Sequence, residues 1–261
     1  MTRRYDDVVE HSPARAEFRF YAELNDHLAQ DQQYQTLERR FYVPGTVKDM
    51  IEGFGIPHTE VELIAVNGES ADFSRLVRDG DRVAVYPVFE SLDIQHELRV
   101  RPEPLRNLKF VLDVHLGKLA GYLRMLGFDS RYGNSSSDPE LVRIATEEQR
   151  VLLTRDRGLL MHAAVSRGYW LRQTESRRQA AEVIRRFDLA AAVRPFTRCM
   201  ACNTALQAAD RADVLGRIPP RTAELHDRFL RCPGCGRVYW QGSPYRRMRR
   251  WIEELLQFDR A

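Results

Sequence analysis

The sequence predicts an α/β protein made of three successive parts. Strands and one helix in the order ββαββ are expected in residues 16–90, strands and helices alternate in residues 109–190, and residues 191–261 contain all four cysteines. Regular alternation of strands and helices is typical of a mostly parallel sheet flanked by helices. Closely spaced cysteine pairs are typical of a small metal-binding ribbon. A chain of 261 residues has the length of about two domains with an appendage.

The first part, residues 16–90, has the pattern of a β-grasp domain. Apolar alternation predicts strands in AEFRFYAEL, LERRFYV, VELIAVNG and DRVAVYPVF, with a helix in GTVKDMIEGFGI between the second and the third. Together with the VNG turn and DGDRVAVYP, these segments resemble the ubiquitin-like sulfur carriers of thiamine and molybdopterin synthesis. Such carriers act through a free Gly-Gly tail, whereas this chain continues as VFESLDIQHEL. We therefore expect a binding or scaffolding module that contacts a protein partner.

Polar segments flank this module. Residues 1–15 are predicted to form a flexible tail, and residues 91–108 are predicted to form a linker that contains Pro102 and Pro104. No apolar run approaches the roughly 18 residues that a membrane helix needs, and the first residues lack the apolar core of a signal peptide. We expect a cytoplasmic protein without a membrane span.

Residues 109–190 are expected to form the parallel sheet. The segments KFVLD, FDSRYG, RVLLTRD and YWLRQ have the pattern of strands, and the segments that follow them have the pattern of helices, including RGLLMHAAVSRG at residues 157–168. Ligands of such sheets bind at the carboxyl ends of the strands. Asp113 ends the first predicted strand and Asp156 ends the third. Their side chains are therefore expected at one edge of the sheet.

Two further acids, Asp138 and Glu140, open the predicted helix DPELVRIATEEQ between these strand ends. Residues two apart on a helix point in different directions, so one is expected to face the site and the other to cap the helix. Carboxylates from separate elements suit Mg²⁺ or Mn²⁺, which prefer oxygen ligands and keep coordination places for a phosphate. The pattern predicts metal-assisted phosphodiester hydrolysis at a site built from Asp113, Asp138, Glu140 and Asp156, with Asp113 and Asp156 as metal ligands.

Asp113 and Asp156 also suit a simpler role. Asp is a favoured N-cap, and both residues precede predicted helices. Each residue alone favours the cap, whereas their matching positions, with an acidic pair between them, favour the metal site. The chain has no Ser/His/Asp spacing or glycine-rich phosphate loop that would predict other chemistry.

The four cysteines form the most specific motif of the chain. Cys199 and Cys202 make one CxxC pair, and Cys232 and Cys235 make another after a long spacer. Each pair places two thiolates on one tight turn, and two such turns complete a tetrahedral zinc site. Disulfides or unrelated core cysteines are the alternatives, and a cytoplasmic location disfavours disulfides. Because four thiolates leave no open coordination position, we expect a structural zinc ion.

The net charge of +3 hides an uneven distribution, because acids outnumber bases in residues 1–100 and bases, mostly Arg, outnumber acids in residues 101–261. An Arg-rich region is typical of nucleic-acid binding. The segment RVYWQGSPYRRMRRWIEELL interleaves cations with aromatic residues, which suits phosphate contact and base stacking. Its predicted RNA-binding residues are Trp240, Arg246, Arg247, Arg249 and Arg250. The alternative is the polar face of a helix whose aromatic residues pack on the ribbon.

Four segments resemble one family. FVLDVHLGKLAGYLRMLGFD, LLTRDRGLL, RPFTRCMACN and RCPGCGRVYWQGSPYRRM are similar to the Mut-seven C-terminal RNase family, a PIN-like nuclease domain with a zinc ribbon, over roughly residues 108–252. That family also occurs fused to a ubiquitin-like domain. The resemblance implies that Asp113 and Asp156 occupy acidic positions of PIN nucleases, with Asp138 or Glu140 at a helix position.

We therefore expect a metal-dependent RNA endonuclease that acts on an RNA such as tRNA or rRNA. Lys118, Arg124 and Arg155 are expected to contact phosphates. Leu159 stands where many PIN nucleases have a further acid, so the acidic shell is expected to be thin. The alternative is a non-catalytic RNA-binding protein of the same fold, associated with tRNA or the ribosome.

Overall fold

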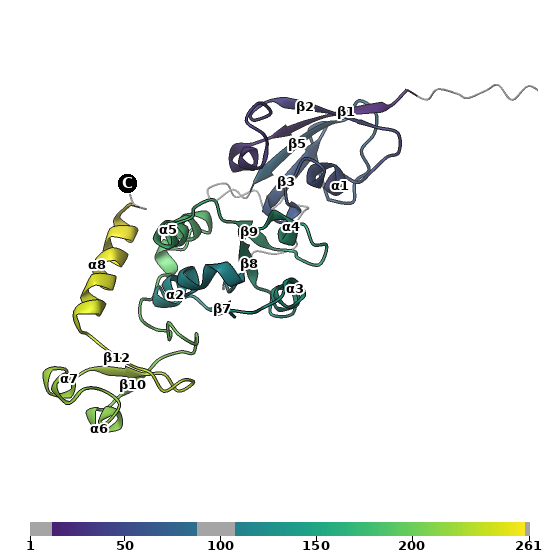
Figure 1. The fold of residues 1–261 in the computed structure, drawn as a ribbon. Coiled ribbons are helices and arrows are strands. Elements are labelled where there is room, and N and C mark those ends of the chain that lie inside the picture. The colour runs from purple at the N-terminus through teal and green to yellow at the C-terminus, as the bar shows by residue number, and fades with distance from the viewer. Residues whose placement is uncertain (1–11, 88–107, 259–261) are drawn as a thin grey trace, which may run out of the picture. The chain divides into compact units, whose positions relative to one another are not determined.

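The structure is a computed structural model that describes residues 12–87 and 108–258 (Figure 1). The chain divides into two compact units, residues 1–104 and 105–261. Most of the predicted tail, and all of the predicted linker 91–108 except Leu108, lie outside the described residues. No helix in the described ranges combines the length and the apolar character that crossing a membrane requires.

The N-terminal unit is a five-stranded mixed sheet in the order β2-β1-β5-β3-β4, in which only β1 and β5 pair in parallel. Its strands are β1 (Ala14–Phe20), β2 (Thr36–Phe41), β3 (Val61–Val66), β4 (Glu69–Ala71) and β5 (Arg82–Pro87). Its helices are η1 (Ala22–His27), α1 (Val47–Glu52) and η2 (His58–Glu60). The mixed sheet confirms the predicted fold class, although β1 begins inside the predicted tail.

Local sequence signals explain this unit. Asn67 and Gly68 join β3 to β4 in a two-residue turn with φ values of 54° and 86°, which is the left-handed backbone that Asn-Gly favours. At the start of α1, the Thr46 hydroxyl accepts a hydrogen bond from the Asp49 N–H at 3.1 Å, as part of a capping box. Alternate residues of β1, including Phe18, lie in the buried cluster. The period-two pattern of the sequence thus marks the buried face.

The C-terminal unit contains a four-stranded parallel sheet in the order β7-β6-β8-β9. Its strands are β6 (Phe110–Leu112), β7 (Ser130–Tyr132), β8 (Val151–Thr154) and β9 (Gly168–Trp170). Its helices are η3 (Val114–Leu116), α2 (Gly117–Met125), α3 (Asp138–Glu147), α4 (Arg157–Leu160) and α5 (Ser176–Arg186). The predicted parallel sheet flanked by helices is confirmed.

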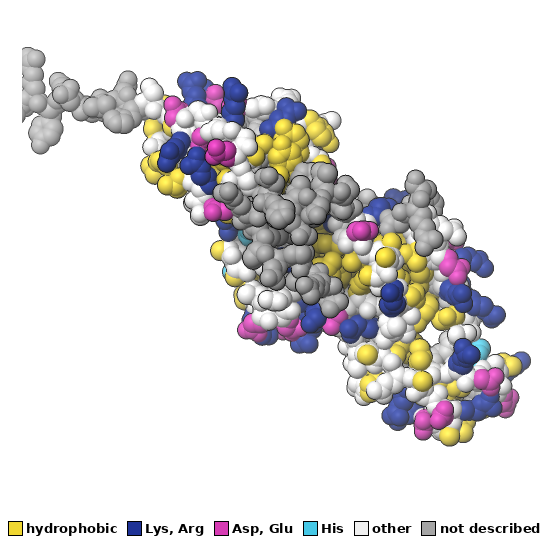
Figure 2. Space-filling view, turned by 180° about the vertical axis from the view of Figure 1, so that it is seen from behind, with side chains coloured by type: hydrophobic (Ala, Val, Ile, Leu, Met, Phe, Trp, Pro, Cys, Tyr) yellow, Lys and Arg dark blue, Asp and Glu magenta, His cyan; other side chains and the backbone are white. Residues whose placement is uncertain are grey.

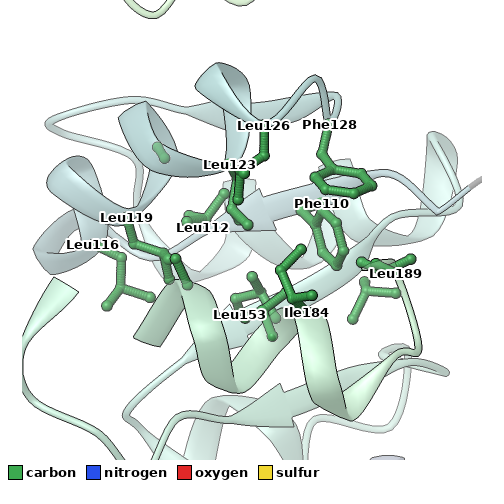
Figure 3. Close-up of a cluster of buried hydrophobic side chains, with 14 of the residues drawn as sticks. Phe110, Leu112, Leu116, Leu119, Leu123, Leu126, Phe128, Leu153, Ile184 and Leu189 are labelled. Atoms are coloured by element: carbon green, nitrogen blue, oxygen red, sulfur yellow. The ribbon is translucent and has the colours of Figure 1, made fainter. Parts of the chain in front are cut away.

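Helices cover both faces of this sheet. α2 and α5 pack on one face, where Leu119 and Ile184 lie in a buried cluster with Phe110 of β6 (Figure 3). On the other face, Leu141 of α3 lies in a second cluster with Val111 of β6. Successive residues of a strand point to opposite faces, so β6 contributes to both clusters. With both faces covered, a ligand reaches the sheet at the strand ends.

The predicted helix over residues 157–168 is wrong in length. α4 ends at Leu160, and the chain then turns before β9. Those turns bring Val165, which is 1% exposed, into the same apolar cluster as Leu160. Burial of an apolar side chain outweighs the modest differences in helix propensity that the sequence pattern reports.

A three-stranded antiparallel sheet forms the ribbon, with strands β10 (Gln207–Ala209), β11 (Phe229–Arg231) and β12 (Val238–Trp240). Two short helices, α6 (Arg211–Val214) and α7 (Pro220–Leu225), belong to this region. The short helix η4 (Ala190–Ala192) precedes it, and Ala190 packs on the buried cluster that contains Phe110. The last helix, α8 (Ser243–Phe258), contributes Ile252 to the cluster of α2 and α5. α8 therefore packs on the parallel-sheet domain, although the sequence grouped it with the ribbon.

Candidate active site and metal centre

The strand ends that precede Asp113 and Asp156 are neighbours. β6 lies between β7 and β8, so the chain leaves β6 for one side and later returns to its other side. Such a reversal opens a crevice beyond the carboxyl ends of the two central strands. Asp113 directly follows β6, and Asp156 follows shortly after β8 ends at Thr154. The structure thus brings both acids to the same edge of the sheet.

Asp113 does not act as a helix cap. It occupies the N-cap position of η3, but its side chain makes no capping hydrogen bond. Instead, the Thr154 hydroxyl donates to Asp113 Oδ2 at 2.7 Å, and the Asp113 N–H donates to the carbonyl of Leu153 at 3.1 Å. The half-buried carboxylate is therefore held against β8, and the capping interpretation does not explain it.

Asp156 does act as a cap. Its Oδ1 accepts a hydrogen bond from the Gly158 N–H at 2.8 Å at the start of α4. Its own N–H donates to Thr154 Oγ1 at 2.9 Å. Thr154 is fully buried and links the two acids, because its hydroxyl donates to one and accepts from the backbone of the other. Asp156, which caps α4, and Asp113, which caps no helix, therefore both form a hydrogen bond with the Thr154 hydroxyl.

Asp138 and Glu140 are both exposed in the first turn of α3. The expectation that one of them caps the helix is wrong, because Ser137 occupies the N-cap position and precedes both. Acids at these positions still interact favourably with the positive end of the helix dipole. Glu140 also lines a cavity of about 330 Å³ with Arg131 and Tyr132, and neither Asp113 nor Asp156 lines that cavity.

The four acids do not form a closed ligand set. Within the described ranges, the group of three or more His, Cys, Asp or Glu residues placed to hold a metal ion is the cysteine cluster. Asp113 Oδ1 and Asp156 Oδ2 have no hydrogen-bond partner among the described residues. Mg²⁺ is commonly bound through one or two carboxylates, several waters and the substrate phosphates. Two carboxylates at one edge of the sheet match the number of protein ligands in such a site.

Leu159 is 6% exposed and lies in the cluster beneath α3. A carboxylate in its place would face apolar side chains, and burying a charge without a partner is costly. The backbone here therefore directs position 159 to the core rather than to the acidic edge, in agreement with the thin acidic shell expected from the sequence.

The four cysteines converge in the ribbon. Cys199 Sγ lies 3.6 Å from Cys235 Sγ, and Cys202 Sγ lies 3.3 Å from Cys232 Sγ. All four sulfur atoms lie within 4.8 Å of one another. Zn–S bonds of about 2.3 Å in a tetrahedron separate the sulfurs by roughly 3.8 Å. The donor set and its spacing therefore fit a zinc ion.

Both CxxC turns have the same backbone. The residue after each second cysteine, Asn203 or Gly236, has a left-handed backbone with φ of 71° or 74°. Its N–H donates to the carbonyl of the first cysteine of its pair at 2.9 Å. Gly234 is also required, because a Cβ at this position would lie 2.5 Å from the Thr204 hydroxyl. The two turns thus present their cysteine pairs in the same local geometry.

The thiol pKa values differ strongly within the cluster. Burial raises the pKa of Cys202, but hydrogen bonds with Thr204 and with neighbouring thiols outweigh it and lower the pKa to about 6. For Cys235, the Arg237 backbone N–H lowers the pKa, but burial and the neighbouring thiols raise it to about 12. The charge of one thiolate thus makes ionisation of the neighbouring thiol less favourable. A divalent ion removes this conflict, so all four sulfurs can bind it ionised.

Arg124, a predicted phosphate contact, connects the ribbon to the sheet. It is 5% exposed, and its Nε donates to the Ser130 carbonyl at 2.9 Å. Its Nη1 donates to the carbonyls of Met200 and Ala201, which lie between the first two cysteines, at 3.2 and 2.8 Å. Three backbone carbonyls thus bind the buried guanidinium of Arg124. Its role in the structure is to join the ribbon to the sheet.

A second connection, centred on Asp129, was missed by sequence analysis. Its Oδ1 accepts hydrogen bonds from Arg150 Nη1 at 2.6 Å and from Asn203 Nδ2 at 2.8 Å. Arg198 of the ribbon lies 3.4 Å from the other oxygen. Asn203 Oδ1 in turn accepts from the Ser130 N–H at 3.0 Å. The first CxxC turn is therefore fixed to the edge strand β7 by side chains that no local pattern marks.

The remaining predicted cations are exposed. Lys118 lies in the first turn of α2, and Arg155 lies between β8 and α4. On α8, four arginines are exposed, and one of them, Arg249, pairs with Glu253 at 2.9 Å. The exposed set on this helix is Arg246, Arg247, Arg249 and Arg250. In Figure 2, Lys and Arg side chains project beside hydrophobic side chains in the region of α8. Cations on an exposed helical face are available to bind phosphates.

Two family models match the chain. Residues 13–93 match the model described as Mut7-C ubiquitin, and residues 108–252 match the model described as Mut7-C RNAse domain. The second match alone covers more than half of the chain, and the order of the two confirms the resemblances found in the sequence. No curated protein and no solved structure matches.

Proposed function

Because the chain belongs to the family of the Mut7-C RNAse domain, we propose that it is a metal-dependent RNA endonuclease of PIN type. The observation that carries this proposal is the Asp113 carboxylate, which Thr154 holds at 2.7 Å beside the carboxyl end of β8. An acid in that place without a capping role is suited to hold a divalent ion. Asp156 is the second ligand, through the oxygen that does not cap α4.

In this mechanism, Asp113 and Asp156 would hold the Mg²⁺ or Mn²⁺, which would supply Lewis-acid chemistry, a more acidic water and positive charge beside the phosphate. Thr154 fixes the orientation of Asp113 and, through the Asp156 N–H, the position of Asp156. Lys118 and Arg155, both exposed near the two acids in sequence, bind phosphates on either side of the cleaved bond. Asp138 and Glu140, in the first turn of α3, are outer acids that hold ordered water.

The ribbon and α8 provide the grip on RNA in this proposal. A zinc ion held by the four cysteines keeps the ribbon folded, and the arginines of α8 with Trp240 contact the nucleic acid. The substrate is an RNA such as tRNA or rRNA in the cytoplasm. The N-terminal module, proposed to span residues 16–90, binds a protein partner rather than carrying sulfur.

A non-catalytic RNA-binding protein is the second candidate. One observation favours it, because the described carboxylates do not assemble into a closed set and Glu140 lines a different cavity from Asp113. In that case the acidic edge is a structural remnant, and the ribbon with α8 carries the whole function.

Substitution of Asp113 by Asn separates the two candidates. In Mg²⁺ or Mn²⁺, the wild type should cleave a panel of tRNA, rRNA fragments and single-stranded RNA, and Asp113→Asn should lower the rate at least 100-fold. RNA binding should remain, because the change keeps the size of the side chain.

Asp188→Asn provides the matched control, since Asp188 is exposed and its left-handed backbone (φ 46°) suits Asn as well. This variant should cleave like the wild type. If the wild type binds the panel but cleaves none of it in either metal, the enzyme is excluded and the RNA-binding candidate stands.

A further inference from the structure

An aromatic cavity lies where the ribbon meets the start of α8. It has a volume of about 280 Å³, at the small end of the roughly 300 to 1,000 Å³ typical of ligand pockets. Its lining includes Phe196, Tyr239, Trp240, Tyr245, Arg198 and Arg228. We call it the ribbon cavity.

The ribbon cavity has a fixed aromatic wall. The rings of Phe196 and Tyr245 lie 4.5 Å apart at an angle of 40°. The Trp240 indole lies over Gly242, where an added Cβ would come within 3.0 Å of its Nε1. Close packing against Gly242 restricts the indole, which is half-buried and lines the cavity. A rigid aromatic face of this kind suits stacking of a flat ring.

A second cavity lies between α2, α5 and α8. It has a volume of about 270 Å³, and its lining includes Lys118, Tyr122, Arg177 and Trp251. The rings of Tyr122 and Trp251 lie 5.0 Å apart. Arg177 lies 5.9 Å from the Trp251 ring centre, and its Nε donates to the Tyr122 hydroxyl at 3.2 Å. We call it the helix cavity.

The two cavities share a wall. Met200, from the first CxxC turn, and Met248, from α8, line both. The helix cavity in turn includes Lys118, which lies in the first turn of α2, the helix that begins soon after Asp113. The two cavities are therefore adjacent and form a row from the ribbon to the helix that follows the acidic strand end, and we call this row the path.

The chemistry along this path indicates its occupant. Each cavity combines aromatic rings with cations, Arg198 and Arg228 in one and Lys118 and Arg177 in the other. Neither lining contains an acid, although Arg198 also pairs with Asp129 outside the cavity. An unpaired nucleotide presents a flat ring and a phosphate together, whereas a duplex keeps its bases stacked internally.

We propose that the ribbon cavity and the helix cavity each bind an unpaired base of single-stranded RNA, and that the strand runs from the ribbon past Lys118 to the acidic edge. This inference rests on the proposed function for its direction, but binding of the bases does not require cleavage. It makes the substrate class a single-stranded segment rather than a duplex.

The three tryptophans of the chain provide the test, because a stacked base quenches indole fluorescence. In the Asp113→Asn background, which prevents cleavage, pairs of Trp→Phe changes leave Trp240, Trp251 or Trp170 as the sole tryptophan. The probes are a single-stranded RNA, the same RNA in a duplex, and the same RNA with abasic residues. Trp240 and Trp251 should be quenched by the single strand and much less by the other two probes.

Quenching that is equal for all three probes would show that only phosphates bind, and it would overturn the proposal. So would RNA binding without any quenching of Trp240 and Trp251. If the wild type cleaves RNA but Trp240 and Trp251 are not quenched, the base-binding proposal is excluded and the endonuclease proposal stands. If both tryptophans are quenched but no RNA is cleaved, the endonuclease proposal is excluded and the base-binding proposal stands.

A single substitution gives an independent measurement without the double changes. Trp240→Leu should weaken binding of the single-stranded RNA roughly 10-fold, since base stacking on an aromatic side chain contributes at least that much. Tyr42→Leu, at a 77% exposed aromatic residue of the other unit, is the control and should bind like the wild type. Zinc content and thermal unfolding of Trp240→Leu must equal those of the wild type. An unchanged affinity would exclude the ribbon cavity as a base site.

Discussion

The cysteine cluster and the acidic edge are two candidate metal sites that differ in how much of each the fold supplies. At the cysteine cluster, all four ligand atoms lie within 4.8 Å of one another. At the acidic edge, the hydroxyl of Thr154 forms hydrogen bonds with both Asp113 and Asp156 and so links the two residues. Asp138 and Glu140 are exposed on α3.

This difference follows the chemistry of the expected ions. Zinc in a structural site takes all its ligands from the protein, so the fold must place all four sulfur atoms around one point. Mg²⁺ keeps several waters and takes further oxygens from the substrate, so an open edge with two carboxylates is sufficient. In the proposed function, the cysteine cluster is therefore a structural element of the fold, and the acidic edge is a site that substrate completes.

The largest expected effect is loss of the cysteine cluster. Cys232→Ser removes a buried thiolate, and the binding free energy of a structural zinc ion, about 10 to 16 kcal/mol, is also folding free energy. Zinc per chain should fall from one to near zero, and the ribbon should lose its ordered structure. Metal analysis and hydrogen exchange over residues 197–242 measure both.

The matched control for this change is Ala201→Ser, which adds the same hydroxyl at an exposed position of the first CxxC turn. It should retain zinc. A Cys232→Ser protein that keeps one tightly bound zinc and an ordered ribbon would show that the four thiolates do not act as one site.

The next effect concerns the acidic edge. Asp156→Asn removes a charge but keeps a good N-cap, because Asn and Asp cap helices about equally well. If Asp156 holds a metal ion, RNA cleavage should fall at least 10-fold, while the melting temperature stays within about 1 °C of the wild type. If Asp156 only caps α4, both quantities should be unchanged. Ser is another good N-cap without a carboxylate. Asp156→Ser should therefore change cleavage and melting temperature in the same way as Asp156→Asn.

Sequence patterns were sufficient where the cause is local. The CxxC turns, the Asn-Gly turn and the two acids at strand ends each depend on a few adjacent residues, so their roles in the fold follow from spacing. The parallel sheet followed from the alternation of strands and helices. The resemblance to one family named the same segments that the family models match.

Contacts between distant segments were beyond those patterns. Arg124 has the sequence context of a phosphate contact, but 76 residues further along the chain it meets the carbonyl of Met200. Thr154 sits inside an apolar strand and gives no sign that its hydroxyl orients Asp113 from the neighbouring strand. Ile252 belongs to an amphipathic helix whose partner, α2 with α5, only the fold reveals. Tertiary packing decides which partner each of these side chains contacts, and the local sequence carries no signal of that partner.

The connection between the ribbon and β7 gives a pH-dependent prediction. Burial raises the pKa of Asp129, but hydrogen bonds from Arg150 and Asn203 outweigh burial and hold the pKa below its usual range. The ionised carboxyl therefore stabilises the fold above its unfolded pKa of about 3.9. This contribution should be lost as the pH falls through the lower, folded pKa.

Asp129→Asn should thus lower the free energy of unfolding by about 1.5 to 3 kcal/mol at pH 7, the contribution of hydrogen bonds to a charged group. The difference from the wild type should shrink below pH 3.9 or so. Urea unfolding between pH 7 and pH 3, with zinc content followed in parallel, measures it. A difference that is independent of pH would mean that Asp129 acts through packing and not through its charge.

The smallest effect tests the threonine that both acids share. Thr154→Val keeps the shape of a fully buried side chain but removes the hydroxyl that donates to Asp113 and accepts from the Asp156 N–H. The free energy of unfolding should fall by about 1.5 kcal/mol, the lower end of the contribution of a hydrogen bond to a charged group. RNA cleavage should fall roughly 10-fold, because Asp113 keeps its charge but loses its fixed orientation.

Thr154→Ser restores the hydroxyl and should recover cleavage, but this variant should remain less stable than the wild type because it lacks the methyl group. Recovery of cleavage without recovery of stability is the outcome that packing alone does not produce, and cleavage that follows stability in both variants would reduce Thr154 to a core residue.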